Sequence, residues 1–257
     1  MLMIISPAKI LNLKPQKVVT NYTQPEFLKQ ASVIVDELKH YPPEKLAELL
    51  ETNFMIAQTN FDRYARWHTP FTRNNAKQSI LTFNGEVYNG LKASSLSQED
   101  LSFSQDHLRI LSGLYGVLRP LDLMQPYRLP MGTSLSFNGY KDLYDFWRKD
   151  ITDALVKYFS RSTKKVLVNL ASDEYFRSVD RKRLNNVRII HCEFKEWKAG
   201  KYKTIVVYTK KARGLMCRFA IEHRITDPEN LKAFDSENYL FEESISSENN
   251  WVFVRHK

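Results

Sequence analysis

Two short apolar runs, each followed at once by a polar loop, constrain the fold of this chain more than any other feature. Leu2–Ile5 ends at Ser6-Pro7, and Val166–Leu170 ends at Ala171-Ser172. Short, mainly apolar runs bounded in this way are typical of buried strands. Since helical patterns fill most of the chain between them, the sequence predicts an α/β fold in which helices surround a mixed sheet.

Two further strands and a last one are predicted in the C-terminal third. Residues 187–194 and 202–208 are rich in β-branched and aromatic side chains, and Ala199-Gly200 lies between them, so they are predicted to form an antiparallel hairpin. Residues 251–254 are expected to form the final strand.

Helical patterns occupy much of the remaining sequence. The strongest runs from 141 to 159, where apolar residues recur on one face and charges on the other. Residues 25–40 and 43–59 are predicted to be two helices separated at Pro42-Pro43, because Pro43 suits a first helical turn. Further helices are expected at 98–111 and 212–224, and Asp227-Pro228 is typical of a capped helix start.

Length and composition favour one compact unit. The chain has 257 residues, without an internal repeat, a low-complexity tract or a Gly/Ser linker, and its ten prolines are scattered. We therefore expect residues 1–257 to form a single domain.

Charge and cysteine content bear on the compartment and the partner. The formal net charge is +9, and the excess is concentrated: residues 161–224 carry 17 Lys and Arg against 6 Asp and Glu. Such a segment favours a polyanionic partner. Only two cysteines are present, and no apolar stretch approaches a signal peptide or a membrane span, so we expect a cytoplasmic protein with free thiols and no membrane partner.

The two strand ends are the first candidate for a site. In parallel sheets, ligands usually bind beyond the carboxyl ends of the strands. If the two runs are parallel neighbours, their loops bring together two hydroxyls, an ammonium and two carboxylates, from Ser6, Lys9, Ser172, Asp173 and Glu174. Such groups suit proton transfer or the positioning of a base or sugar. The alternative is that the serines and Asp173 only cap the following turns.

A second candidate is a basic segment expected to open a helix after a strand. Its cations are Lys210, Lys211, Arg213 and Arg218. At a helix start, these side chains and the free backbone amides could hold the same phosphate. The alternative is a solvated face on which Arg218 pairs with Glu222.

The glycine turn at 113–116 is a third candidate, with Arg119 and Arg128 close behind it. Glycine turns can admit a phosphate to backbone amides, although simple chain reversal with core packing is the alternative.

Metal chemistry lacks a signature: the six histidines are dispersed, no HExxH or zinc-spaced cysteine pair occurs, and we expect no metal and no cofactor. Signatures for dinucleotide, P-loop and hydrolase-elbow sites are also missing.

Several long motifs, in order along nearly the whole chain, resemble the YaaA peroxide-stress protein family. They are MLMIISPAK at the start, FNGEVYNGL at 83–91, LRILSGLYGVLRPLDLMQPYRLPMG at 108–132, KDLYDFW at 141–147, NLASDEYF at 169–176 and KKARGLMCRF at 210–219. The resemblance implies a cytoplasmic bacterial protein that limits free intracellular iron and oxidative damage. It also implies a single α/β domain of unusual topology, with a positively charged cleft, a helix-hairpin-helix element and binding to duplex or branched DNA. The helix-hairpin-helix is expected either at 25–59 or at the glycine turn 113–116.

Two functional classes remain open at this point. In the first, the chain is a DNA-binding stress protein that neutralises phosphates with lysines and arginines. In the second, it is an enzyme acting on a nucleobase, nucleotide or nucleic acid, with Ser172, Asp173 and Glu174 as working groups and a small-molecule or nucleotide ligand. The resemblance implies no catalytic residues.

Overall fold

An eight-stranded mixed sheet forms the centre of the molecule. The structure is a computed structural model that describes residues 1–15 and 21–256. The strands of this sheet are β1 (Leu2–Ile5), β5 (Leu108–Ser112), β6 (Gly116–Leu118), β8 (Val166–Leu170), β9 (Arg188–Lys198), β10 (Lys201–Lys203), β11 (Tyr239–Phe241) and β12 (Asn250–Arg255). Their order is β11-β12-β9-β8-β1-β5-β6, with β10 paired to β9 at the side. From β12 through β9, β8 and β1 to β5, neighbours run parallel, and the pairs β11 with β12, β5 with β6 and β10 with β9 are antiparallel.

Two small ladders lie outside the central sheet. One pairs β2 (Ile10–Leu11) with β4 (Phe83–Asn84), and the other pairs β3 (Lys77–Gln78) with β7 (Leu123–Met124). The first ladder ties the segment after β1 to the segment that precedes α5, and both segments border the site described below.

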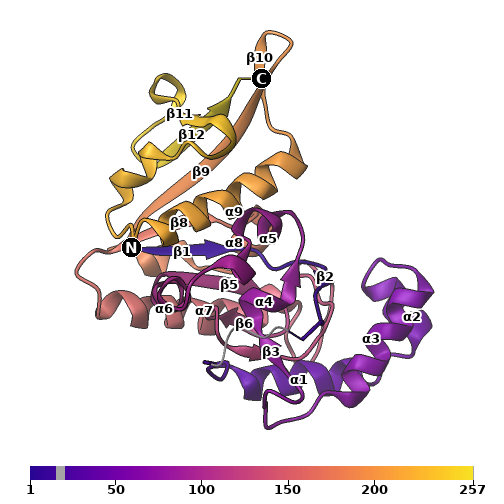
Figure 1. Cartoon of the computed structure of the whole chain (residues 1–257). Coiled ribbons are helices and arrows are strands. Elements are labelled where there is room, and N and C mark those ends of the chain that lie inside the picture. The colour runs from indigo at the N-terminus through magenta and orange to yellow at the C-terminus, as the bar shows by residue number, and fades with distance from the viewer. Residues whose placement is uncertain (16–20, 257) are drawn as a thin grey trace.

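Helices flank the sheet, and two of them form a projecting lobe. The α-helices are α1 (Leu28–Leu38), α2 (Pro43–Leu49), α3 (Phe54–Arg66), α4 (Ser79–Thr82), α5 (Glu86–Leu91), α6 (Gln98–His107), α7 (Leu143–Ser160), α8 (Asp173–Phe176) and α9 (Val206–Glu222). Short 3₁₀ turns are η1 (Ala93–Ser95), η2 (Arg181–Leu184), η3 (Pro228–Ala233), η4 (Ser236–Asn238) and η5 (Glu243–Ile245). Figure 1 shows α9 beside β9, with α5 crossing α9, and shows α2 and α3 standing away from the sheet.

The predictions for β1, β8, β12 and α7 are confirmed. Each residue of β1 is 0% exposed, because the strand lies between two parallel neighbours and helices cover the sheet. On α7, the apolar face packs into the core, and the indole of Trp147 donates a hydrogen bond of 2.8 Å to the Gly113 carbonyl. The capped start at Asp227-Pro228 is confirmed as well, since the Asp227 side chain accepts from the Glu229 amide at 3.2 Å.

The predicted antiparallel hairpin is confirmed, since β10 pairs with β9, but the extent of its second strand, 202–208, and the predicted helix start at 212 are wrong. β10 ends at Lys203, and α9 already begins at Val206. The β-branched run 205–207 favours a strand locally, but the close packing of α9 against α5 overrides that preference. As a consequence, Lys210, Lys211 and Arg213 lie on the second turn and beyond, so the free amides of the helix start lie a turn away from them.

Two helix boundaries are also wrong. The pattern at 43–59 divides into α2 and α3, because the Asn53 side chain accepts from the Ile56 amide at 2.9 Å and starts a new helix. The helix predicted at 98–111 ends at His107, and Leu108 enters β5 directly, since those residues pair with β1 in the core.

The glycine turn at 113–116 is a buried strand connection. It joins β5 to β6, so the placement of a helix-hairpin-helix there is wrong. A Cβ on Gly113 would lie 2.2 Å from the Leu129 carbonyl oxygen, and one on Gly116, where φ is +66°, would lie 2.7 Å from the Trp147 ring. Both glycines are therefore required by core packing, and the turn has no room for a phosphate.

Candidate functional site

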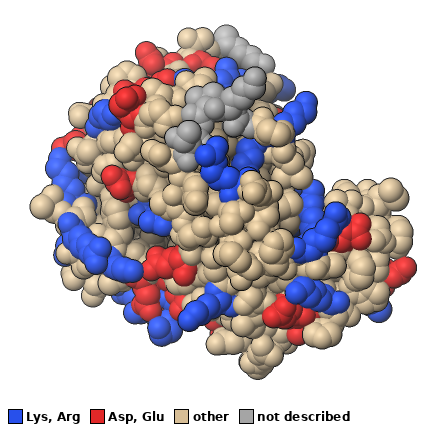
Figure 2. Space-filling model, turned by 60° about the horizontal axis from the view of Figure 1, so that its bottom comes forward, with Lys and Arg blue, Asp and Glu red and all other residues tan. Residues whose placement is uncertain are grey.

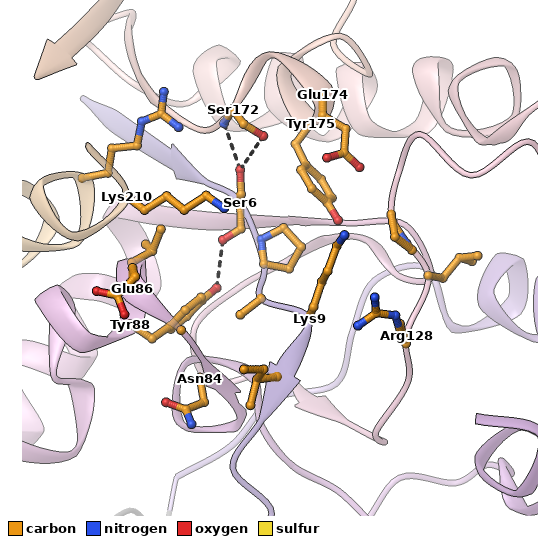
Figure 3. Close-up of a pocket in the computed structure, with 18 of the residues that line it drawn as sticks. Ser6, Lys9, Asn84, Glu86, Tyr88, Arg128, Ser172, Glu174, Tyr175 and Lys210 are labelled. Carbon is orange, nitrogen blue, oxygen red and sulfur yellow. Dashed lines mark hydrogen bonds between the residues drawn. The ribbon is translucent and has the colours of Figure 1, made fainter. Parts of the chain in front are cut away.

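A cavity of about 340 Å³ lies beyond the carboxyl ends of β1 and β8. The two strands are parallel neighbours, with Ile5 opposite Leu170, so the residues that follow them share one edge of the sheet. We call this cavity the cationic pocket, after the side chains described below. Its polar and aromatic lining consists of Ser6, Lys9, Asn84, Glu86, Tyr88, Tyr127, Arg128, Ser172, Glu174, Tyr175, Lys210 and Arg213 (Figure 3).

The floor of the pocket is a hydrogen-bonded tie between the two strand ends. The Ser6 hydroxyl accepts from the Ser172 amide at 2.9 Å, and the two hydroxyl oxygens lie 3.2 Å apart. The Tyr88 hydroxyl donates to the Ser6 carbonyl at 3.1 Å (Figure 3). Ser172 does stand at the N-cap position of α8, but its side chain makes no capping bond. Its hydroxyl therefore belongs to the pocket wall.

Four cations from three parts of the chain face this cavity. Lys9 follows β1, Arg128 lies in the loop after β7, and Lys210 and Arg213 lie on α9. Figure 3 shows Lys210 to the left of Ser6 and Lys9 to its right, with Glu174 and Tyr175 of α8 above the end of Lys9.

Two of these cations have a buried donor without a partner. The Nε atoms of Arg128 and Arg213 are buried and make no hydrogen bond to any described residue. Burial lowers the pKa of Arg213, and the nearby Asp173 carboxylate opposes that effect. A buried guanidinium donor without an acceptor costs free energy, so both arginines are suited to an anionic ligand.

The two predicted carboxylates, Asp173 and Glu174, lie in different surroundings. Glu174 lines the pocket and accepts from the Gly132 amide at 3.2 Å, whereas Asp173 stands outside the lining. Asp173 acts instead on Arg213 and on His191, whose pKa it raises against the stronger effect of burial. Both carboxylates are exposed, and the prediction that both join the group at the strand ends holds for Glu174 and not for Asp173. The reason is that α8 is a single short turn on the surface.

A wall of tyrosines is the part of the site that sequence reasoning missed. Tyr88, Tyr127 and Tyr175 line the cavity, and burial raises the pKa of each phenol, so all three are neutral at pH 7. The Tyr127 hydroxyl lies 2.6 Å from the Ser112 hydroxyl. The signal in the sequence was that each tyrosine lies in one of the long motifs quoted above, at 83–91, 108–132 and 169–176.

The other predicted cations have internal partners. Lys211 pairs with Glu237, Arg218 pairs with Glu222 at 2.7 Å, and Arg119 pairs with Asp122 at 3.0 Å. Arg218 also donates to the Leu91 carbonyl at 3.1 Å. None of these three lines the cationic pocket.

Positive charge is not continuous over the surface that Figure 2 shows. On that face, lysines and arginines alternate with acidic residues, both on the main body and on the lobe of α2 and α3 at the right. Local unpartnered cations therefore distinguish the cationic pocket better than net charge does.

Within residues 1–15 and 21–256, no group of three or more His, Cys, Asp or Glu side chains is arranged to hold a metal ion. No helix in the same ranges is long and apolar enough to cross a membrane.

Fold and site together define an α/β protein with a small cationic pocket at the carboxyl edge of a mixed sheet. The model of the family described as peroxide stress protein YaaA matches residues 1–245, and the chain belongs to that family. It is similar to UPF0246 proteins: 49% identical over 255 residues to one from Ralstonia nicotianae, covering 99% of each chain, and 49% identical over 261 residues to one from Azoarcus sp., covering 100% of each. A UPF0246 protein from Neisseria gonorrhoeae is 48% identical over 255 residues, covering 99% of this chain and 98% of the relative.

Proposed function

We propose that this peroxide-stress family member binds DNA, mainly through its phosphates, at the cationic pocket. The observation that carries the proposal is the convergence of Lys9, Arg128, Lys210 and Arg213 on one cavity, with two guanidinium donors that lack an acceptor among the described residues. Phosphate oxygens are strong acceptors that match the planar fork of arginine.

The pocket cations carry more of this proposal than the rest of the basic segment. Lys211, Arg218 and Arg119 must give up an ion pair before they neutralise a phosphate, whereas the four pocket cations form no ion pair with any described side chain. We therefore assign the first three a peripheral role in the same DNA contact.

The projecting lobe supplies the second part of the proposal. Residues 25–59 fold into α1, α2 and the start of α3, with short turns between them. We propose that these helices act as the helix-hairpin-helix element and contact duplex or branched DNA beside the pocket. A cytoplasmic location and the limitation of free iron, both implied by the family resemblance, complete the proposal.

Binding across a salt series tests the electrostatic core of this proposal. For B-DNA, each neutralised phosphate contributes about −0.9 to the slope of log affinity against log salt, so four contacts give roughly −3.6. Replacing Lys210 with Gln and Arg213 with Gln together should weaken binding to unrelated sequences equally and make the slope shallower by about 2.

A control variant must remove two cations elsewhere. Lys149 on α7 and Lys182 in η2 are both exposed and lie outside the pocket lining. Replacing both with Gln should leave the slope within about 0.5 of the parent value, since neither lysine lines the pocket that neutralises the phosphates. If both double variants lose the same amount of DNA affinity, the assignment of DNA binding to the cationic pocket is refuted.

An enzyme acting on a nucleobase or nucleotide is the second candidate. It is favoured by the presence of Ser6, Lys9, Ser172 and Glu174 on one cavity, since hydroxyl, ammonium and carboxylate groups can transfer protons. Glu174→Gln should then abolish complementation of peroxide sensitivity without weakening DNA binding, since the change removes a negative charge from the pocket wall. Full complementation by a folded Glu174→Gln protein would leave DNA binding as the function.

A further inference from the structure

We propose that the cationic pocket is a nucleotide site, which holds the phosphate, sugar and base of one nucleotide. The inference rests on the proposed function, because it takes the same pocket to be the place where DNA phosphate is bound. It goes further because it states what fills the inner part of the cavity, namely the sugar and the base, which phosphate contacts alone do not explain.

The size of the cavity sets the upper limit on its ligand. Pockets for small ligands have volumes of about 300–1,000 Å³, and this cavity, at about 340 Å³, lies at the lower end. That volume suits one nucleotide and excludes a base pair of an intact duplex. A duplex lying across the mouth would reach the cations and leave the rest of the cavity unfilled.

The walls divide into a cationic part and an aromatic part. Arg213 and Lys210 lie on successive turns of α9 and supply the positive charge on one side. The tyrosines lie elsewhere, and the hydroxyls of Tyr88 and Tyr127 are already bonded to Ser6 and Ser112. The surface they offer is therefore the ring, which stacks on a base or packs against a sugar.

Acceptors and donors for a base or sugar border the same space. Glu86, Asn84 and Glu174 line the cavity, and Glu86 and Glu174 each have one carboxylate oxygen bonded, to Asn89 at 3.1 Å and to the Gly132 amide at 3.2 Å. The second oxygen of each remains available to accept from an amino group or a sugar hydroxyl. A simple phosphate ion would use none of these groups, and a nucleoside would use none of the cations.

Two sources supply the same ligand chemistry, a free nucleotide and a nucleotide extruded from DNA, and a ligand series first tests for binding of the nucleotide itself. We expect 2′-deoxynucleoside 5′-monophosphates to bind the full-length protein, by calorimetry, at least tenfold more tightly than inorganic phosphate and the matching nucleosides. Arg213→Gln should weaken monophosphate binding at least tenfold, whereas the Lys149→Gln, Lys182→Gln control should not change it.

A fluorescent DNA identifies the source. A duplex carrying one unpaired 2-aminopurine should change its emission on binding, and excess monophosphate should reverse that change because it displaces the extruded nucleotide and its phosphate from the pocket. A response from the DNA assigns the site to an extruded nucleotide, and monophosphate binding without that response assigns it to a free nucleotide.

The inference and the proposed function fail in different ways. Absence of monophosphate binding up to about 5 mM, or inorganic phosphate binding as tightly as the monophosphate, overturns the nucleotide site even when duplex binding persists. Tight monophosphate binding together with no duplex binding at low salt overturns the DNA-binding proposal and leaves the nucleotide site standing. Folded Arg128→Gln and Arg213→Gln proteins that both keep the parent monophosphate affinity would show that the unpartnered arginine donors are not the phosphate ligands, and would overturn the nucleotide site.

Discussion

Replacing Gly214 with Ala should destabilise the protein and disturb the cationic pocket together. Gly214 lies where α9 crosses α5, and a Cβ there would stand 1.7 Å from the Val87 carbonyl oxygen. The facing Gly90 has the reciprocal contact, because its Cβ would meet the Lys211 carbonyl oxygen at 2.2 Å. Since both neighbours are helix backbone, neither can rotate away, and the helices must move apart by at least about 1.3 Å to reach 3.0 Å, the shortest contact that a Cβ tolerates.

The expected loss can be estimated from two opposing effects. Overpacking in a core typically costs about 1–3 kcal/mol and occasionally more, and an unyielding backbone contact places this case at about 4 kcal/mol. Alanine recovers about 1 kcal/mol over glycine within a helix. The free energy of unfolding should therefore fall by about 3 kcal/mol, which lowers Tm by roughly 6–12 °C in a chain of this size.

Thermal and urea denaturation measure this change, and a second glycine provides the control. A Cβ on Gly132 would meet nothing closer than 3.6 Å, so Gly132→Ala should change the free energy of unfolding by less than about 0.5 kcal/mol. Because α5 carries Tyr88 and α9 carries Arg213, the Gly214→Ala protein should also bind DNA more weakly. If the free energy of unfolding of the Gly214→Ala protein lies within about 1 kcal/mol of the parent value, the close crossing of the two helices is refuted.

Three further predictions concern charge and titration. Asp173→Asn removes a carboxylate that acts on Arg213. The affinity for phosphate, measured by calorimetric titration, should therefore rise about twofold to fivefold, which is the size of effect expected for an exposed charge pair. An unchanged affinity would show that Asp173 has no influence on the pocket. Burial, followed by the charge of Arg181, lowers the pKa of His191 below its ordinary 6.5. As pH falls, the unfolded state therefore takes up the proton before the folded state does, and the free energy of unfolding should fall below pH 6.5. The difference in the free energy of unfolding between pH 7.5 and pH 5.5 should be smaller for His191→Gln than for the parent protein. Burial raises the pKa of Cys192 to about 12 and raises that of Cys217 as well, so neither thiol should react with iodoacetamide at pH 8 until the protein is denatured, and mass spectrometry that found either one alkylated in the native state would contradict this.

Elements whose sequence pattern agrees with their surroundings could be predicted. β1 and β8 are short apolar runs closed by polar loops, and α7 has one continuous apolar face, so local pattern and final packing coincide. β5 could not be predicted, because no turn residue separates it from α6 and its apolar residues continue the helical pattern. The start of α9 could not be predicted either, because Val206 and Val207 favour a strand locally. These residues are helical because α9 packs against α5.

The same distinction holds for the site. Ser6, Lys9, Ser172 and Glu174 were placed from the strand ends, because parallel strands bring their loops to one edge. Arg128 and Tyr127 reach the pocket through the loop after β7, whose path depends on core contacts such as Leu129 against Gly113. No local pattern in that loop indicates where it will lie.

The difference between net charge and available charge decides what the salt experiment means. Residues 161–224 carry 17 Lys and Arg, and at least seven of them are in ion pairs: Lys164, Arg183, Arg188, Lys195, Lys211, Arg218 and Arg224. If DNA were held by the whole segment, its excess of 11 positive charges (17 less 6) would give a slope near −10, whereas the four pocket cations give about −3.6. The slope therefore separates a diffuse basic surface from a local site, and a value steeper than about −7 would show that the ion-paired cations, rather than the pocket, hold the DNA.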